Sequence, residues 1–255
     1  MAIIQTKDLT KIYTIGRNKT VVGLNHLNLT IEEGELFGIL GPNGSGKTTC
    51  LKLLLGTLFP TSGEAYIMGK TPYDVEMKQH VGFLPENPYY YEYLTGKELL
   101  LFYGKLFDID KEVLKEKIEE LLKLVGLENT KKLSLRHYSK GMLERIGLAA
   151  SLINDPKILI LDEPTTGLDP IGCRDTRNLL IQLKDAGKTI LLSSHFLSEV
   201  ERVCTRIAIL HKGVLLTTGK LDELMDKYKS VNLEDLFIKT IDEYEEKIQT
   251  QGVAQ

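Results

Sequence analysis

Apolar and polar residues follow one another in two rhythms along this chain, and each rhythm predicts a different kind of element. Three short and nearly unbroken apolar runs are typical of buried strands: ELFGILG (residues 35–41), KILILD (157–162) and KTILLSS (188–194). Stretches with apolar residues at three- and four-residue spacing lie next to them, and this alternation is typical of α/β proteins. We therefore expect a mostly parallel sheet with helices packed on it.

The first third of the chain has another pattern. AIIQTKDL (2–9), VVGLNHLNLTI (21–31) and GEAYIMG (63–69) are short apolar or alternating runs that turn residues separate from one another. Such runs are typical of strands joined by turns, which pair antiparallel. We expect an antiparallel sheet beside the parallel core.

Strand patterns disappear between Pro88 and about Asn154. GKELLLFYGKLF (96–107) and KEVLKEKIEELLKLVGL (111–127) instead carry apolar residues at helical spacing, and the second has charged residues at most of its other positions. We predict an inserted α-helical lobe at about residues 88–154, within one domain of residues 1–230. Residues 231–255 are predicted to be a short C-terminal extension, a strand or a helix with a frayed end.

Composition and charge narrow the possible partners. The 255-residue chain has a net charge of -3 at pH 7 and no basic block, so nucleic acid is not an expected partner. Its three cysteines lie far apart and outside any metal-binding spacing, which favours a reducing compartment over a disulfide framework or a zinc site. The N-terminus becomes charged too early for a signal peptide, and no apolar run approaches the roughly 20 residues of a membrane span. We do not expect the chain to cross a membrane by itself.

A glycine-rich stretch after the first buried strand carries the strongest chemical signal. GPNGSGKTT precedes the helical run CLKLLLGTL, so it satisfies G-x-x-x-x-G-K-[ST] in the strand, loop and helix context that the phosphate-loop motif requires. Its glycines let backbone N–H groups turn toward phosphate oxygens, and the N-terminus of the following helix favours negative charge. Lys47 is expected to reach the β- and γ-phosphates, and the Thr48 hydroxyl is placed for Mg²⁺. The predicted nucleotide-binding residues are Gly41, Pro42, Asn43, Gly44, Ser45, Gly46, Lys47, Thr48 and Thr49.

A second apolar strand, ILILDEP (158–164), ends in two carboxylates. Ligands of open α/β sheets usually lie at such strand ends. Asp162 and Glu163 are adjacent on an extended chain, so their side chains point to different sides and can serve different purposes. A lone acidic residue here would more simply be a helix cap, but the pair combined with the phosphate loop favours nucleotide hydrolysis. We predict that Asp162 binds Mg²⁺, directly or through water, while Glu163 polarises the attacking water.

Several further motifs, in their order along the chain, resemble the nucleotide-binding subunit of ATP-binding cassette (ABC) transporters. YSKGMLER (138–145) lies shortly before the acidic strand end, as the family's signature does, and GLDP (167–170) is similar to its D-loop. LLSSHFLSEVE (191–201) has His195 where the family has its switch histidine. The resemblance covers nearly the whole chain. It implies ATP as the nucleotide and a P-loop NTPase α/β core with an antiparallel β subdomain and an inserted α-helical lobe.

The resemblance also implies roles for residues outside the loop. Tyr13, in LTKIY, matches the aromatic residue that stacks on adenine. GFLPENPYYYEYLTGKELL (82–100) is similar to the Q-loop region, with Glu86 near the metal ion in place of the usual glutamine. The tyrosines that follow are a hypothetical surface for binding another protein. They are Tyr89, Tyr90, Tyr91 and Tyr93.

In that family the signature acts from a second protomer, where its serine and backbone amides meet the γ-phosphate. Lys140 and Met142 replace a glycine and the glutamine of the commoner string, while Ser139 and Gly141 are kept. A hydroxyl, a small residue and a helix N-terminus are groups that suit phosphate recognition. A lysine beside an anion is electrostatically favourable, so we expect the signature to work.

The stretch VNLEDLFIKT (231–240) is similar to the end of cassettes that serve small ABC-2 type exporters. The function implied is ATP binding and hydrolysis that powers a separate transmembrane permease subunit, with a second ABC ATPase subunit as partner, at the cytoplasmic face of the cell membrane. Two alternatives stay open at this point. One is a membrane-coupled ABC ATPase that does not transport, and the other is a nucleotide-dependent binding module without turnover.

Overall fold

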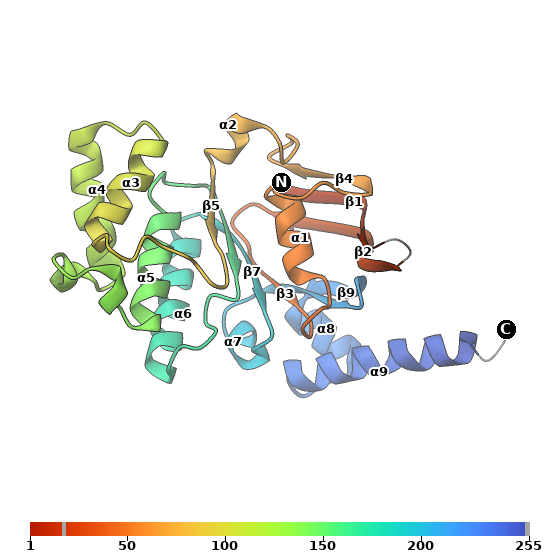
Figure 1. Cartoon of the computed structure of the whole chain (residues 1–255). Coiled ribbons are helices and arrows are strands. Elements are labelled where there is room, and N and C mark those ends of the chain that lie inside the picture. Colours follow the sequence, from red (N-terminus) through yellow and green to blue (C-terminus); the bar gives the residue numbers. More distant parts are fainter. Residues whose placement is uncertain (17–18, 253–255) are drawn as a thin grey trace. The chain divides into compact units, whose positions relative to one another are not determined.

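The computed structural model of the chain describes residues 1–16 and 19–252. It contains both strands and helices (Figure 1), and the chain forms two compact units. The first unit is Met1–Asp74 together with Leu191–Gln255, and the second is Val75–Ile190. The predicted extension after residue 230 belongs to the first unit, and a domain boundary at that point stays a prediction.

An antiparallel sheet begins the first unit, as the N-terminal pattern predicts. β1 (Ala2–Ile15) lies in the middle, with β2 (Lys19–Glu32) on one side and β4 (Ser62–Ile67) on the other. Both neighbours run antiparallel to β1. Ile4 and Ile31 face each other across the β1–β2 pair and are fully buried, so the apolar positions of these runs form one side of a packed layer.

The phosphate loop lies between a buried strand and a helix of the first unit. All five residues of β3 (Leu36–Leu40) are buried, and α1 (Lys47–Leu54) follows the loop. β3 pairs in parallel with β8 (Arg206–His211), which confirms the expected parallel core. β8 in turn pairs antiparallel with β9 (Val214–Lys220). The sequence pattern did not predict β8 and β9.

Three helices complete the first unit: α7 (Leu197–Glu201), α8 (Leu221–Tyr228) and α9 (Leu233–Gly252). The extension predicted as a strand or a helix is therefore a helix of 20 residues. The end that was expected to fray falls outside the described residues. None of the helices in the described part of the chain is both long and apolar enough to span a bilayer.

The second unit carries the acidic strand end. β5 (Val81–Leu84) and β6 (Ile158–Asp162) pair in parallel, and every residue of β6 is buried. α2 (Val75–Lys78) precedes β5, and α6 (Pro170–Asp185) follows β6. β7 (Thr189–Ser194) continues from this unit into the first.

The predicted helical lobe is also part of the second unit. From Pro88 to Asn154 every regular element is helical: α3 (Gly96–Leu106), α4 (Lys111–Leu124), the short 3₁₀ turns η1 (Glu128–Thr130) and η2 (Leu135–His137), and α5 (Lys140–Ser151). α3, α4 and α5 pack on one another (Figure 1).

The helix α4 buries the apolar positions of its sequence pattern. Leu114, Ile118, Leu121 and Leu122 are buried, and the charged residues between them form the solvated face that the pattern predicts. The helix begins where the Asp110 carboxylate accepts hydrogen bonds from two backbone N–H groups of the first turn.

Candidate functional site

Two glycines of the phosphate loop have no room for a side chain. A Cβ on Gly41 would clash with Ser45 Oγ and with the carbonyl oxygen of Leu210 on β8. Gly46 has a φ of 108°, in the left-handed region, and a Cβ there would lie 2.5 Å from the carbonyl oxygen of Gly23. The loop backbone is thus packed too closely at these two positions for any residue except glycine.

Two polar side chains of the loop are buried inside it. Lys47 is only 6% exposed, and its Nζ donates a hydrogen bond of 2.8 Å to the carbonyl oxygen of Gly41. Ser45 Oγ is buried and has no hydrogen-bond partner among the residues that the structure describes. A buried hydroxyl without a partner costs about 1–3 kcal/mol. An oxygen-rich anion fits this cradle, because it offers acceptors to the hydroxyl and a counter-charge to the lysine.

The helix after the loop presents its N-terminus to the same place. Gly46 is the N-cap residue of α1 and supplies no side-chain cap, and the first turn of α1 contains no acidic residue. The first N–H groups of a helix need acceptors, and the helix dipole favours a negative charge there. The start of α1 is therefore suited to bind phosphate.

Tyr13 lies beside the loop, although 36 residues separate it from Thr49. Its hydroxyl is 3.2 Å from Thr49 Oγ1, and its ring lies against Gly23, where a Cβ would clash with it. The Lys11 ammonium is 5.5 Å from the ring centroid. The fold of the first unit thus brings together the predicted adenine-stacking residue and the predicted phosphate cradle.

His195 belongs to the same unit and directly follows β7. It is exposed, and its ring centroid lies 4.2 Å from that of Phe196 in a tilted arrangement. The backbone N–H of Phe196 donates to Ser194 Oγ over 2.9 Å, which fixes the turn that presents the histidine. His195 is therefore held at a strand end, and its role as the switch histidine stays a prediction.

The two adjacent carboxylates belong to the second unit. Asp162 ends β6 and is 4% exposed, while Glu163 is 5% exposed and has a φ of 55°. A left-handed φ is uncommon for a residue with a side chain. Thr166 Oγ1 donates to Glu163 Oε2 over 3.3 Å and so orients the carboxylate. Glu86 lies after β5 in the same unit and is exposed.

The signature forms the start of a helix. Ser139 is the N-cap residue of α5, and its Oγ accepts a hydrogen bond of 3.2 Å from the N–H of Met142. Ser139 is exposed, and the first turn of α5 contains no acidic residue. The chain therefore has a second helix N-terminus that is free of acidic side chains and suited to an anion.

The signature packs against the GLDP segment within the second unit. The Lys140 ammonium lies so close to Gly167 that a Cβ there would clash with it. A Cβ on Gly141 would make an ordinary contact of 3.6 Å with Leu168 Cδ2. The lysine that departs from the commoner signature is thus directed toward the D-loop segment.

The tyrosines after Glu86 do not share one environment. Tyr89, Tyr91 and Tyr93 are 97%, 56% and 73% exposed. Tyr90 points inward, and its hydroxyl fills the space beside Gly147 on α5, where a Cβ would clash with it. Burial raises the pKa of Tyr90. The hypothetical binding surface therefore consists of the other three tyrosines, and Tyr90 is a packing residue.

Comparison with known families shows which proteins share the phosphate loop, the signature and the acidic strand end of this chain. The family model described as ABC transporter matches residues 24–166, more than half of the chain. This chain belongs to the ABC transporter family. The matched region contains the phosphate loop, the signature and the acidic strand end of the cassette.

Individual relatives agree with this membership. An uncharacterized ABC transporter ATP-binding protein of Nostoc sp. is 49% identical over 237 residues, which are 91% of this chain and 71% of that protein. The bacitracin transport ATP-binding protein BcrA of Bacillus licheniformis is 41% identical over 91% of this chain and 76% of its own length. A dimeric, post-hydrolysis structure of the ATP-binding cassette MJ0796 with ADP and phosphate is 30% identical, with a TM-score of 0.78 over 86% of this chain and 98% of that one. The ABC cassette fold predicted from the sequence is confirmed.

The sequence pattern missed one unusual residue of the signature helix. Glu144 is 2% exposed, and its Oε1 has no hydrogen-bond partner within the described part of the chain. Burial raises the pKa of this carboxyl to about 8, although the charge of Lys140 opposes the shift. Lys140 and Arg145 lie near Glu144 in the same helix, and a charged residue in such a stretch is expected to be solvated. Only the packing of α5 shows that Glu144 is buried.

Proposed function

We propose that this chain is the ATP-binding and ATP-hydrolysing subunit of an ABC-2 type exporter, and that it works with a second cassette and a separate transmembrane permease. One observation carries the proposal: a buried lysine, a buried hydroxyl without a partner among the described residues and an uncapped helix N-terminus surround one backbone cradle. The similarity to a bacitracin transport ATP-binding protein supports a role in transport. The resemblance of residues 231–240 to the end of ABC-2 type exporter cassettes favours the exporter class.

The proposal assigns the nucleotide to the first unit. Lys47 neutralises the β- and γ-phosphates, and Ser45 together with the N–H groups at the start of α1 donates to their oxygens. Tyr13 stacks on the adenine ring, a contact that is worth about 1–3 kcal/mol per base in stacking proteins. The position of its ring beside the loop supports this role.

Three of the predicted site residues carry side-chain oxygens that suit a divalent cation. Thr48, Asp162 and Glu86 offer hydroxyl and carboxylate oxygens, the ligands that Mg²⁺ prefers, and they would hold the ion directly or through its water. When it is bound, Mg²⁺ neutralises charge on the phosphate oxygens. The burial of Asp162 at the end of β6 supports a structured ligand in preference to a surface charge.

Two residues are assigned to the hydrolytic step. Glu163 accepts a hydrogen bond from the attacking water and orients it. The hydrogen bond from Thr166 to its carboxylate and its left-handed backbone support this role. His195 donates to the γ-phosphate as charge develops on it. The water's oxygen then forms the new bond to the γ-phosphorus, the bond from that phosphorus to the bridging oxygen of ADP breaks, and the water's proton passes to the Glu163 carboxylate.

A second cassette completes the proposed site. Ser139 and the amides around Gly141 in one copy meet the γ-phosphate held by the phosphate loop of the other copy. The start of α5, which is exposed and free of acidic residues, supports a role toward a ligand outside its own chain. The related cassette that was solved as a dimer supports pairing.

The permease is proposed to dock at the exposed tyrosines. Tyr89, Tyr91 and Tyr93 follow Glu86 directly, so a change at the metal ion can reach them through a few residues of backbone. Tyrosine is enriched at the centres of protein interfaces. Binding there would place the chain at the cytoplasmic face of the membrane, where ATP is available.

The substitution Glu163→Gln tests the proposed function. We expect the purified variant to bind ATP with about the affinity of the wild type, to lose nearly all phosphate release and to form a dimer that light scattering detects in MgATP. Glu120→Gln is the matched control, because it changes an exposed carboxylate of the second unit and should leave all three properties unchanged.

The outcomes separate the proposed function from a nucleotide-dependent binding module. A wild-type chain that binds ATP but releases no phosphate, even with its permease, would be a binding module and not an ATPase. Unchanged single-turnover hydrolysis in Glu163→Gln would remove Glu163 from its assigned role.

A further inference from the structure

The turn between β8 and β9 touches the phosphate loop directly. It consists of Lys212 and Gly213, whose φ angles of 48° and 80° are both left-handed, as a tight two-residue hairpin requires. The Gly213 N–H donates to the Ser45 carbonyl oxygen over 2.9 Å, and its own carbonyl accepts 2.7 Å from the Asn25 N–H. A Cβ on Gly46 would lie 3.5 Å from Gly213 Cα. The turn is therefore a backbone support for the loop that the proposed function assigns to phosphate.

One carboxylate of α9 holds this turn from its other side. Glu245 Oε1 accepts from His211 Nε2 and from Lys212 Nζ, each over 2.6 Å. The side chains of His211, Glu245 and Lys212 are 13%, 32% and 60% exposed, so the contact with the histidine is the more buried of the two. The hydrogen bonds from Lys212 and His211 hold the pKa of the Glu245 carboxyl below its usual range, with Lys212 as the larger cause.

The histidine depends on this carboxylate. His211 Nδ1 is buried and has no hydrogen-bond partner among the described residues, and the ring of Tyr244 lies edge-on to the imidazole with centroids 5.9 Å apart. The bond to Glu245 is the one hydrogen bond that the structure shows for this ring within the described residues. Removing the carboxylate would leave a largely buried imidazole with two unsatisfied nitrogens, which costs more than the loss of an ordinary surface ion pair.

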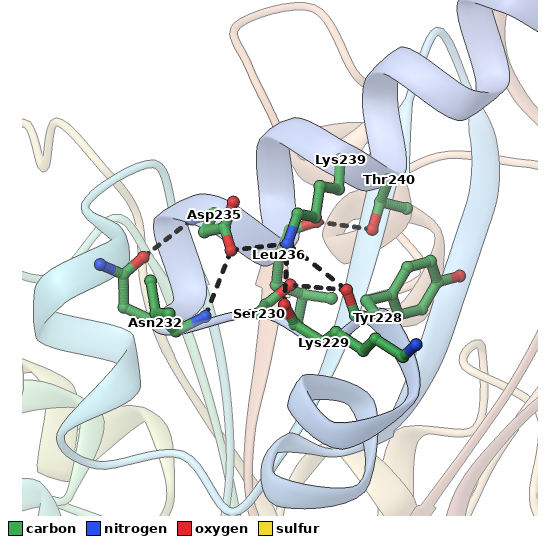
Figure 2. A network of polar contacts seen from close by, with 9 residues as sticks. Tyr228, Lys229, Ser230, Asn232, Asp235, Leu236, Lys239 and Thr240 are labelled. Carbon is green, nitrogen blue, oxygen red and sulfur yellow. Dashed lines mark hydrogen bonds and ion pairs between the residues drawn. The ribbon is translucent and has the colours of Figure 1, made fainter.

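The beginning of α9 is anchored, so Glu245 is presented from a fixed element. Figure 2 shows the network: Asp235 accepts from the Lys239 ammonium over 2.8 Å, and Lys239 also donates to the Lys229 carbonyl oxygen over 2.9 Å. Asn232 Oδ1 caps the helix by accepting 2.8 Å from the Asp235 N–H. Leu236, one turn into the helix, is fully buried. These contacts fix the first turns of α9, and the continuous helix then holds Glu245 in place.

We propose that Glu245 is a positioning residue for nucleotide binding: it holds His211 and Lys212, and through Gly213 it keeps the backbone of Ser45 in the shape that accepts phosphate. The inference rests on the proposed function of the phosphate loop. Glu245 touches no nucleotide in this proposal and acts only through the turn.

The size of the effect follows from the number of hydrogen bonds between the turn and the phosphate loop. One backbone hydrogen bond joins the turn to Ser45, and the net worth of one such bond corresponds to about a twofold to tenfold change in an equilibrium constant. We therefore expect Glu245→Ala to weaken ATP binding about threefold to tenfold. The rate of hydrolysis at saturating ATP should change less than the KM, because no group that acts on the water is moved.

Three variants of the full chain test the inference. Glu245→Ala removes the carboxylate, and Glu245→Gln keeps an oxygen that can accept from Lys212 and His211. Glu246→Ala is the matched control, because it removes the same charge from the adjacent and exposed position of α9. ATP affinity is measured by titration with ATP itself, well below the unfolding temperature of each variant. Hydrogen exchange of the Gly213 amide is measured in the same samples.

The inference is supported when Glu245→Ala speeds exchange of the Gly213 amide and weakens ATP binding about threefold or more, while Glu245→Gln and Glu246→Ala stay within about twofold of the wild type. It is overturned when Glu245→Ala matches Glu246→Ala in both measurements, or lowers only the unfolding temperature. A wild-type chain that does not bind ATP would defeat the proposed function instead, and Gly213 exchange would still decide whether α9 holds the loop.

Discussion

The buried carboxyl of Glu144 makes the stability of this chain depend on pH in a direction opposite to that of most glutamates. Its pKa of about 8 in the folded chain lies above the ordinary value of 4.5, because burial on α5 disfavours the ionised form. Between these two values the folded state binds more protons than the unfolded state. The contribution of Glu144 is therefore fully present below pH 4.5 and is lost as the pH rises through 8.

The size of this loss can be worked from the same two values. Each pH unit between them costs about 1.4 kcal/mol. At pH 7 the cumulative loss is about 3 kcal/mol, which is a large share of the stability of a typical domain. Glu144→Gln has a similar shape and does not titrate, so it should remove this pH dependence. The free energy of unfolding of the variant should rise relative to the wild type by about 3 kcal/mol between pH 5 and pH 8.

Denaturant unfolding at a series of pH values measures this difference. Far-ultraviolet circular dichroism is the suitable signal, because the chain has no tryptophan. Glu116→Gln on α4 is the matched control: Glu116 is exposed, and its replacement should leave the pH dependence of the wild type unchanged. Parallel curves for the wild type and Glu144→Gln would show that Glu144 is ionised in the folded chain, and the reasoning from its burial would then be wrong.

Two further predictions concern aromatic residues. Tyr13→Ala should weaken ATP binding about tenfold or more in a titration, because it removes the ring that we propose to stack on adenine. Tyr13→Phe loses only the contact with Thr49 and should stay within about threefold of the wild type. Equal effects of the two variants would contradict a stacking role. Tyr89→Ala should leave the ATPase of the isolated chain unchanged and weaken binding to the permease about tenfold in a pull-down titration, since this ring is 97% exposed. Phe59→Ala, an exposed aromatic elsewhere, is its control, and a similar affinity for both variants would exclude Tyr89 as a docking residue.

The strands and helices with clear patterns could be predicted from the sequence. β3, β6 and β7 lie in short and nearly unbroken apolar runs, and α3 and α4 keep helical spacing over eleven and fourteen residues. Apolar content and periodicity are properties of each segment alone, so these elements can be predicted before the chain is folded.

The missed strands have weaker local signals. β5 has four residues and includes Gly82, whose lack of a side chain makes room for a neighbouring backbone carbonyl. β8 and β9 are joined by Lys212 and Gly213, and not by the Asn-Gly or Asp-Gly pair that marks most such hairpins. β5 and β8 pair in parallel with β6 and β3, which are distant in sequence, so no local pattern marks these two strands.

The candidate site also has parts that the sequence predicts and parts that only the folded chain shows. The phosphate loop and the two carboxylates are contiguous motifs, and sequence alone is enough to find them. Burial distinguishes Tyr90 from its neighbours and Glu144 from the other charged residues of α5, and burial depends on how α5 packs. The contact between Glu245 and His211 joins residues 34 positions apart, and no local pattern predicts it.

The backbone at Glu163 implies a trade-off in how this chain evolves. A φ of 55° costs a residue with a side chain about 1 kcal/mol, and glycine or asparagine would adopt the same angle more easily. Selection for stability alone would therefore favour replacing Glu163, whereas selection for the water-orienting role that we propose would keep it. Homologous chains that have lost the need to hydrolyse ATP should drift toward glycine or asparagine at this position, and such a change would mark an inactive cassette in a sequence before any assay is made.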